Sequence, residues 1–138
     1  RGLHYADVPP GQAKYVTCVA GSIRDVVVDV RLGSPTFGQH VAVELSAENR
    51  HAVFVPVGFA HGFAALSDAT VMYVTTSEYD PEIERELNPC DPALAIEWGV
   101  AEPIMSEKDV AAVSLADAQS LETMLRDAWV MANEEAVQ

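Results

Sequence analysis

Positive charge is scarce in this chain of 138 residues, which has only eight Lys or Arg against 21 Asp or Glu and a net charge of −13. A surface this acidic repels nucleic acid and anionic membranes, so we expect neither as a partner. A small anionic ligand is still compatible with this charge if the few cations gather in one place. The eight cations are Arg1, Lys14, Arg24, Arg31, Arg50, Arg85, Lys108 and Arg126.

Cysteine is also scarce, with Cys18 in a strand-like run and Cys90 in a loop. Their spacing fits neither a disulfide scaffold nor a zinc site, so we interpret both as incidental thiols. Together with the lack of a signal peptide, this favours a reducing cytoplasm. No apolar run is long enough to span a membrane.

Several catalytic signatures are missing. There is no H-x-H pair of the kind that metal-binding β-barrels use to converge ligands on one ion, so no metal site is predicted. There is also no G-x-S-x-G element, no P-loop and no dinucleotide fingerprint. These absences argue against acyl transfer and against the common nucleotide-binding folds.

The sequence instead contains six or seven short strands within one domain, at regular spacing and with turn residues between them. No helical pattern separates them, which favours a mainly β fold, an antiparallel sandwich or barrel. Pro81 to Arg85 is interpreted as a loop or short turn, and Asn88 to Trp98 as an irregular connection. The predicted strands are Lys14 to Val19, Ile23 to Val30, Phe37 to Leu45, His51 to Val55, Phe59 to Leu66 and Thr70 to Thr76.

The C-terminal part changes period. Apolar residues recur at helical spacing from Leu115 to Trp129, and Ser114 with Asp117 resembles a capping box. We expect a β domain over 1–113, an amphipathic helix over 114–132 packed on it, and a frayed tail over 133–138.

Four histidines are candidates for chemistry. His4 lies in an extended stretch, so it faces opposite Leu3 and Tyr5 and can point into a cavity. Alone, a strand-end His of this kind is more often simply hydrogen-bonded. His40 and His51 lie at strand ends among polar residues and are interpreted as surface or structural.

His61 lies between Ala60 and Gly62, where small neighbours let a ligand approach. A satisfied core His is the equally weighted alternative. Tyr73 lies mid-strand, either packed in the core or acting as a proton donor in a cavity. Asp109 lies in a charged stretch that is either a solvated turn or the partner of a His, whose tautomer it would fix.

These residues fall within motifs that resemble the dTDP-4-dehydrorhamnose 3,5-epimerases, sugar-nucleotide epimerases of cupin fold. The motifs occur in family order from Arg1 to about Val113. They are Arg1-Gly2-Leu3-His4-Tyr5, Ser34-Pro35-Thr36-Phe37-Gly38, Leu45-Ser46-Ala47-Glu48-Asn49, Pro56-Val57-Gly58-Phe59-Ala60-His61-Gly62-Phe63, Ile96-Glu97-Trp98 and Ser106-Glu107-Lys108-Asp109.

The resemblance implies a cupin-type jelly-roll barrel that forms a homodimer and binds a dTDP-4-keto-6-deoxyhexose, with no metal or redox cofactor. His4 matches the family's base, Asp109 its partner, and Tyr73 the proton donor on the opposite sugar face. The implied substrate-contacting residues are Arg1, Lys14, His61, Tyr79, Glu84 and Lys108. The implied reaction inverts C3, C5 or both through an enolate, which needs a base and a second acid.

The chain departs from the family pattern at Ala6, Arg24 and Val74. The family's N-terminal segment, which helps to bind nucleotide, has no counterpart before Arg1. Two other functions stay open: a sugar-nucleotide 3,4-ketoisomerase that moves the carbonyl, and a sugar-nucleotide-binding cupin without activity.

Overall fold

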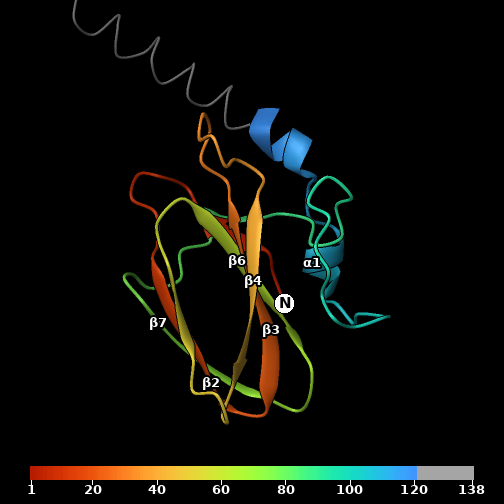
Figure 1. Ribbon diagram of the computed structural model, residues 1–138. Coiled ribbons are helices and arrows are strands. Elements are labelled where there is room, and N and C mark those ends of the chain that lie inside the picture. The colour runs from red at the N-terminus through yellow and green to blue at the C-terminus, as the bar shows by residue number, and fades with distance from the viewer. Residues whose placement is uncertain (121–138) are drawn as a thin grey trace, which may run out of the picture.

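Eight short strands build the described part of the protein, residues 1–120 of a computed structural model (Figure 1). They form two sheets that face each other, and strand pairing is antiparallel throughout both. The sheets have the orders β4-β3-β6-β1-β8 and β5-β2-β7, so the predicted mainly β class is confirmed. The strands are β1 His4–Ala6, β2 Lys14–Ala20, β3 Ser22–Asp29, β4 His40–Ser46, β5 Ala52–Val55, β6 Phe59–Ala65, β7 Thr70–Thr75 and β8 Glu84–Glu86.

Strand β3 lies inside the larger sheet and is apolar on both faces. Val26 and Val28 point to an outer cluster that also contains Leu3 and Tyr5. Val27 points to an inner cluster between the two sheets. Because a fully buried Val stabilises the fold by roughly 1.5–3 kcal/mol, this strand anchors both cores.

The inner face of the larger sheet carries the predicted histidines. Val27 pairs with His61 on β6, His61 pairs with His4 on β1, and His4 pairs with Glu86 on β8. Directly paired residues share a face, so these four side chains form one row across four strands. The row lies on the same face as the inner cluster, opposite Leu3 and Tyr5, as the alternation in the sequence predicts.

Two glycines let β1 and β6 approach closely at this row. A Cβ on Gly2 would lie 2.6 Å from the carbonyl oxygen of His61, and one on Gly62 would lie 2.7 Å from the carbonyl oxygen of Arg1. Gly2 also has a φ of +104°, which L side chains rarely adopt. The close spacing of His4 and His61 therefore requires glycine, which has no side chain, at these two positions.

A buried carboxylate organises the turn between β3 and β4. Asp29 is 3% exposed and accepts hydrogen bonds from Arg31, Ser34 and Thr36. The hydrogen bond from Arg31 and the weaker effects of the Ser34 and Thr36 hydroxyls hold the pKa of Asp29 far below its usual range, although burial acts to raise it. A strand was predicted to begin at Phe37, but β4 begins at His40. The network around Asp29 explains the difference, because it holds the preceding residues in a turn.

One further prediction is corrected in part. Pro81 to Arg85 was predicted to be a loop or short turn; residues 81–83 form a turn, but residues 84–86 form strand β8, which pairs along β1. The charged stretch from Ser106, for which a solvated turn and a partner for a His were the two alternatives, contains helix α1 (Glu107–Val110) with Asp109 buried, which excludes the solvated turn. The irregular connection over residues 88–98 is confirmed, since no helix or strand occurs there.

The second helical segment begins where the capping pattern predicts. Residues 115–120 are helical, and the Ser114 hydroxyl accepts from the backbone N–H of Asp117 and bonds its carboxylate. Ala118 belongs to the outer cluster. The rest of the predicted helix and the predicted frayed tail lie outside the described residues. No helix among residues 1–120 has the length and apolarity needed to cross a membrane.

Candidate active site

The His4 imidazole is hydrogen-bonded to the buried carboxylate of Asp109. Nε2 of His4 lies 2.8 Å from Oδ1 of Asp109, and the two side chains are 12% and 2% exposed. An ionised carboxylate can only accept, so Nε2 carries the proton and Nδ1 is left with a free lone pair. This is the arrangement of a general base with a fixed tautomer.

Local structure places Asp109 for this contact. Ser106 caps α1 by accepting from the backbone N–H of Asp109, and the backbone N–H of Gly2 reaches Oδ2 of Asp109 at 3.3 Å. Burial opposes ionisation of Asp109, but the hydrogen bonds from His4, Ser106 and Gly2 outweigh it and lower its pKa. The partner of the base is therefore a carboxylate at neutral pH.

A second His–Asp pair lies beside the first. Nε2 of His61 is 2.7 Å from Oδ2 of Asp25, and both residues are buried. The other carboxylate oxygen of Asp25 is buried, and no residue in the described part of the chain hydrogen-bonds it. Because a buried carboxylate is costly unless paired, His61 is its main compensation. Asp25 was not predicted as a site residue from the sequence, although an acid next to a run of valines in a strand indicates a buried carboxylate that needs a partner.

Lys14 and Glu84 extend the site on the side of β2 and β8. Burial lowers the pKa of Lys14, and the charge of the nearby Glu84 opposes this effect. Oε1 of Glu84 lies 3.7 Å from Nδ1 of His4. Glu84 thus lies beside both His4 and Lys14.

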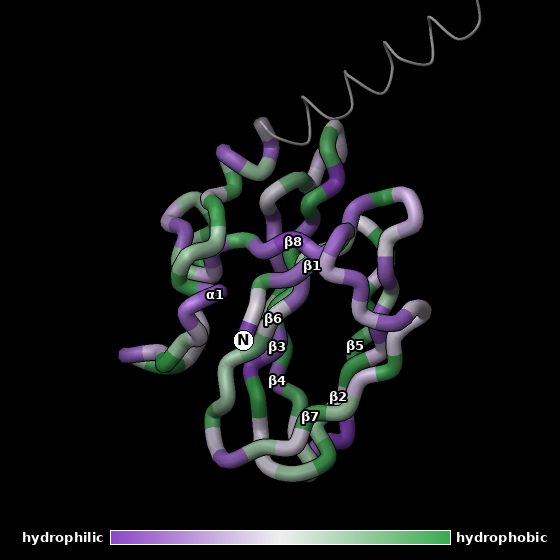
Figure 2. Tube along the Cα trace, turned by 180° about the vertical axis from the view of Figure 1, so that it is seen from behind, coloured by the Kyte–Doolittle hydropathy of each residue, from purple (hydrophilic) through white to green (hydrophobic). Residues whose placement is uncertain are grey.

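Tyr73 lies on the opposite sheet from His4. It pairs with Val16, which is buried between the sheets, so it shares the inward face with Val16 and Lys14. Its side chain is 57% exposed, so the phenol is open to solvent. Figure 2 shows β1, β6 and β3 of the larger sheet on one side of the fold and β5 and β2 of the smaller sheet on the other. His4 on β1 and Tyr73 on β7 therefore belong to the inward faces of different sheets.

Lys108 and Tyr79 lie near the two acids of β8, Glu84 and Glu86. The ammonium of Lys108 forms an ion pair with Glu86, and Tyr79 is close enough to act on it electrostatically. Glu86 is a second residue that the sequence did not predict as part of the site; it follows the stretch from Pro81 to Arg85 that was predicted to be a loop or short turn.

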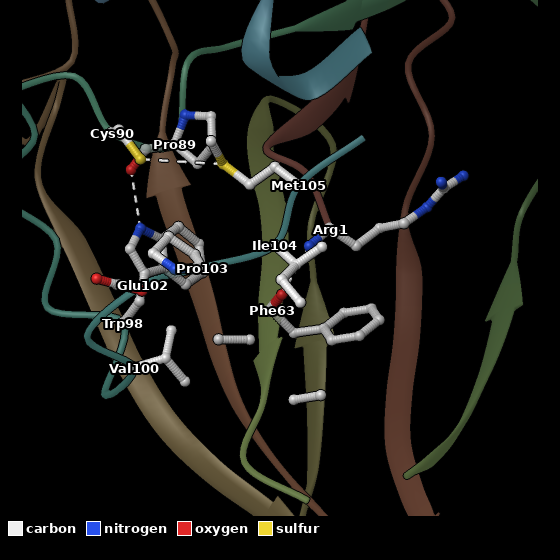
Figure 3. A pocket seen from close by; sticks show the side chains of 12 residues that line it. Arg1, Phe63, Pro89, Cys90, Trp98, Val100, Glu102, Pro103, Ile104 and Met105 are labelled. Atoms are coloured by element: carbon white, nitrogen blue, oxygen red, sulfur yellow. Dashed lines mark hydrogen bonds between the residues drawn. The ribbon is translucent and has the colours of Figure 1, made fainter. Parts of the chain in front are cut away.

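Arg1 directly precedes Gly2, whose backbone N–H bonds Asp109. It lines a cavity of about 350 Å³ whose other walls are largely apolar, with Phe63, Trp98 and Ile104 among them. In Figure 3 the guanidinium of Arg1 points away from Phe63 and Ile104. His4 does not line this cavity. Within residues 1–120, no three His, Cys, Asp or Glu side chains are grouped so as to hold a metal ion.

Comparison with known proteins identifies the family of this chain. The sequence profile of dTDP-4-dehydrorhamnose 3,5-epimerase matches residues 1–117. The chain belongs to the dTDP-4-dehydrorhamnose 3,5-epimerase family. The family resemblance predicted from the sequence motifs is thereby confirmed, and with it the barrel fold expected of the family.

Two curated relatives show how the family divides. The dTDP-4-dehydrorhamnose 3,5-epimerase of Mycobacterium tuberculosis is 50% identical over 124 residues, covering 87% of this chain and 61% of that protein. The dTDP-4-dehydrorhamnose 3-epimerase of Streptomyces niveus is 50% identical over 120 residues, covering 86% and 58%. The chain therefore spans only about three fifths of the length of these relatives.

Solved structures of the family have the same fold. NovW, a 4-keto-6-deoxy sugar epimerase from the novobiocin biosynthetic gene cluster of Streptomyces spheroides, superposes with a TM-score of 0.87 at 49% identity, covering 88% of this chain and 62% of that one. ChmJ, a 3'-monoepimerase from Streptomyces bikiniensis solved with dTDP-quinovose, gives 0.85 at 48% identity, covering 88% and 63%.

Proposed function

We propose that this protein is a cytoplasmic, cofactor-independent isomerase that inverts C3, C5 or both in a dTDP-4-keto-6-deoxyhexose during deoxysugar biosynthesis. The observation that carries the proposal is the position of His4, paired with Asp109, on one sheet, while Tyr73 lies on the inward face of the other. Epimerisation needs a base on one face of the sugar and an acid on the opposite face. The relatives named as epimerases support it.

In the proposed reaction, Nδ1 of His4 takes the proton from the carbon next to the ketone. Asp109 holds Nε2–H, orients the ring and stabilises the imidazolium that forms. The electrons move to the ketone oxygen as an enolate, which Lys14 or His61 stabilises by donating to it. The phenol of Tyr73 then delivers a proton to the opposite face, which inverts the carbon. Each proton transfer of this kind typically accelerates a reaction about 10²–10⁴-fold.

We propose dTDP as the nucleotide because structures of related epimerases contain dTDP or dTDP-sugars. Arg1, Lys14, His61, Tyr79, Glu84 and Lys108 are the proposed contacts. Relatives named as 3,5-epimerases and as 3-epimerases occur at the same identity, so the number of inverted centres needs a direct measurement.

Solvent exchange tests the proposal. The protein is incubated with dTDP-4-dehydro-6-deoxyglucose in D₂O, and NMR follows deuterium at C3 and C5. Uptake at both carbons indicates a 3,5-epimerase, and uptake at C3 alone a 3-epimerase. A carbonyl that moves to C3 would identify the ketoisomerase instead, and no exchange at either carbon contradicts the proposal.

The variant His4→Asn tests the assignment of the base. We expect exchange to fall at least 10³-fold while dTDP affinity changes less than threefold, because Asn keeps the polarity but cannot accept the proton. His51→Asn, a change at an exposed His, is the matched control. Exchange that survives in His4→Asn excludes His4 as the base.

We also propose that the protein works as a homodimer. The outer face of the three-stranded sheet exposes an apolar patch made of Tyr15, Phe54, Met72 and Val74, which are 49–63% exposed. A patch of this kind on a sheet face is typical of an interface. Sedimentation of the wild type and of Phe54→Lys tests it, since the substitution should shift a dimer toward monomer.

A further inference from the structure

Glu86 and Lys108 form an ion pair next to the proposed base. Glu86 is the direct pairing partner of His4 across β1 and β8, and Lys108 precedes Asp109 in α1. The four residues therefore form two adjacent pairs. His4 is hydrogen-bonded to Asp109, and Glu86, its neighbour across the strands, forms an ion pair with Lys108, the residue before Asp109.

Lys108 is a cation placed where an anionic ligand can reach it. Its side chain is 50% exposed and that of Glu86 is 26% exposed. Glu86, and with it the charge of Glu84, raises the pKa of Lys108 against the effect of burial. By contrast, Arg31 and Arg85 are held in ion pairs away from His4, with Asp29 and Asp7.

An ion pair this open to solvent is weak, because water screens its charges and holding two long side chains in place costs entropy. A phosphate group carries more negative charge and more acceptor oxygens than a carboxylate, so it competes well for the same ammonium. Once Lys108 binds phosphate, Glu86 loses its partner and lies close to a second anion. The carboxylate of Glu86 therefore opposes anion binding twice, by holding Lys108 and by repulsion.

We propose that Glu86 is an affinity-determining residue that competes with the diphosphate of the ligand for Lys108. This rests on the proposed function, because it takes the ligand to be a dTDP-sugar. Lys108 alternates between Glu86 in the free protein and the diphosphate in the complex. Glu86 sets dTDP affinity below the value that the cations alone would give, and the returning pair favours release of the nucleotide product.

Calorimetric titration of the whole chain with dTDP tests the proposal, using wild type, Glu86→Gln, Lys108→Met and the double variant. We expect Glu86→Gln to lower the Kd about 3–10-fold and Lys108→Met to raise it. In the Lys108→Met background, Glu86→Gln should change the Kd less than twofold. Glu107→Gln, an exposed acid on the same helix, removes the same charge without releasing Lys108 and should leave the Kd unchanged.

Thymidine, which lacks phosphate, is the control ligand, and its affinity should not respond to Glu86→Gln. Thermal unfolding verifies that each variant is folded. Equal or weaker dTDP binding by Glu86→Gln overturns the inference and leaves the proposed function intact. A tighter Kd for thymidine as well as dTDP also overturns it, because the effect is then not directed at phosphate. A wild type that binds no dTDP overturns both.

Discussion

His4 and His61 lie directly opposite each other on β1 and β6, and the Nε2 of each is hydrogen-bonded to a different buried aspartate. Asp109 reaches His4 from a helix, and Asp25 reaches His61 from the neighbouring strand β3. Both imidazoles are therefore held at one nitrogen, which leaves each Nδ1 for a ligand. The two pairs make separable predictions, because Asp109 is proposed to serve the base and Asp25 to serve a residue that contacts the enolate.

Asp109→Asn should lower kcat about 100-fold or more, with little change in KM. The amide keeps the shape, but its NH₂ group can donate to Nε2 of His4, which moves the ring proton to Nδ1 and blocks the base. Steady-state kinetics measure the effect. Asp68→Asn, a change at an exposed acid, should leave kcat unchanged. A kcat within threefold of wild type in Asp109→Asn contradicts the role of Asp109.

Asp25→Asn should lower kcat about 10-fold or more, because His61 loses the carboxylate that orients it. The double variant Asp25→Asn/His61→Asn should be little worse than His61→Asn alone, since the two residues act as a unit. Kinetics of the two single variants and the double variant give the coupling energy. Urea unfolding separates this effect from lost stability. Additive effects on kcat would show that Asp25 supports only the fold.

Asp29→Asn should lower the free energy of unfolding at pH 7 by about 2 kcal/mol, because it weakens a buried charged network. The pKa of Asp29 lies below the unfolded value of about 3.9, so the folded state binds fewer protons. The stabilisation is present above about pH 4 and is lost as the pH falls below it. Urea titrations from pH 7 to pH 2.5 should show the difference between the wild type and the variant narrow as the pH falls below about 4.

Gly62→Ala should destabilise the protein by about 1–3 kcal/mol and also reduce kcat. The added methyl meets the carbonyl of Arg1 at 2.7 Å and the side chain of Leu3 at 3.2 Å, so β1 must move away from β6. Gly33→Ala is the comparison, since a Cβ there meets nothing within 4 Å and only the φ of +80° is strained. Activity lost to the same extent in both variants would argue against a role for strand spacing.

The sequence predicted most of the strands because alternation of apolar residues is a local signal. The run from Val26 to Val30 was readable as a strand without knowledge of its neighbours. Strand β8 was missed because Glu84, Arg85 and Glu86 carry no apolar alternation, and they become a strand only by pairing with β1.

The site was predicted in part. The contact of Asp109 with His4 followed from the family resemblance, and the structure confirms that the two side chains are hydrogen-bonded. The pairs Asp25–His61 and Glu86–Lys108 were not predicted, because strand order and register decide which side chains meet. Nothing in a single sequence ties residue 25 to residue 61. The catalytic and substrate-binding roles stay predictions that the experiments above test.

The 105 positions that separate His4 from Asp109 have a consequence for the protein as it is made. Translation proceeds at roughly 5–20 residues per second, so several seconds pass between the two residues. During that interval all eight described strands are synthesised before α1. A chain that ends after β8 contains every described strand but lacks Asp109, the proposed partner of the base. Under the proposed mechanism, such a chain could form its sheets without having the complete His4–Asp109 pair.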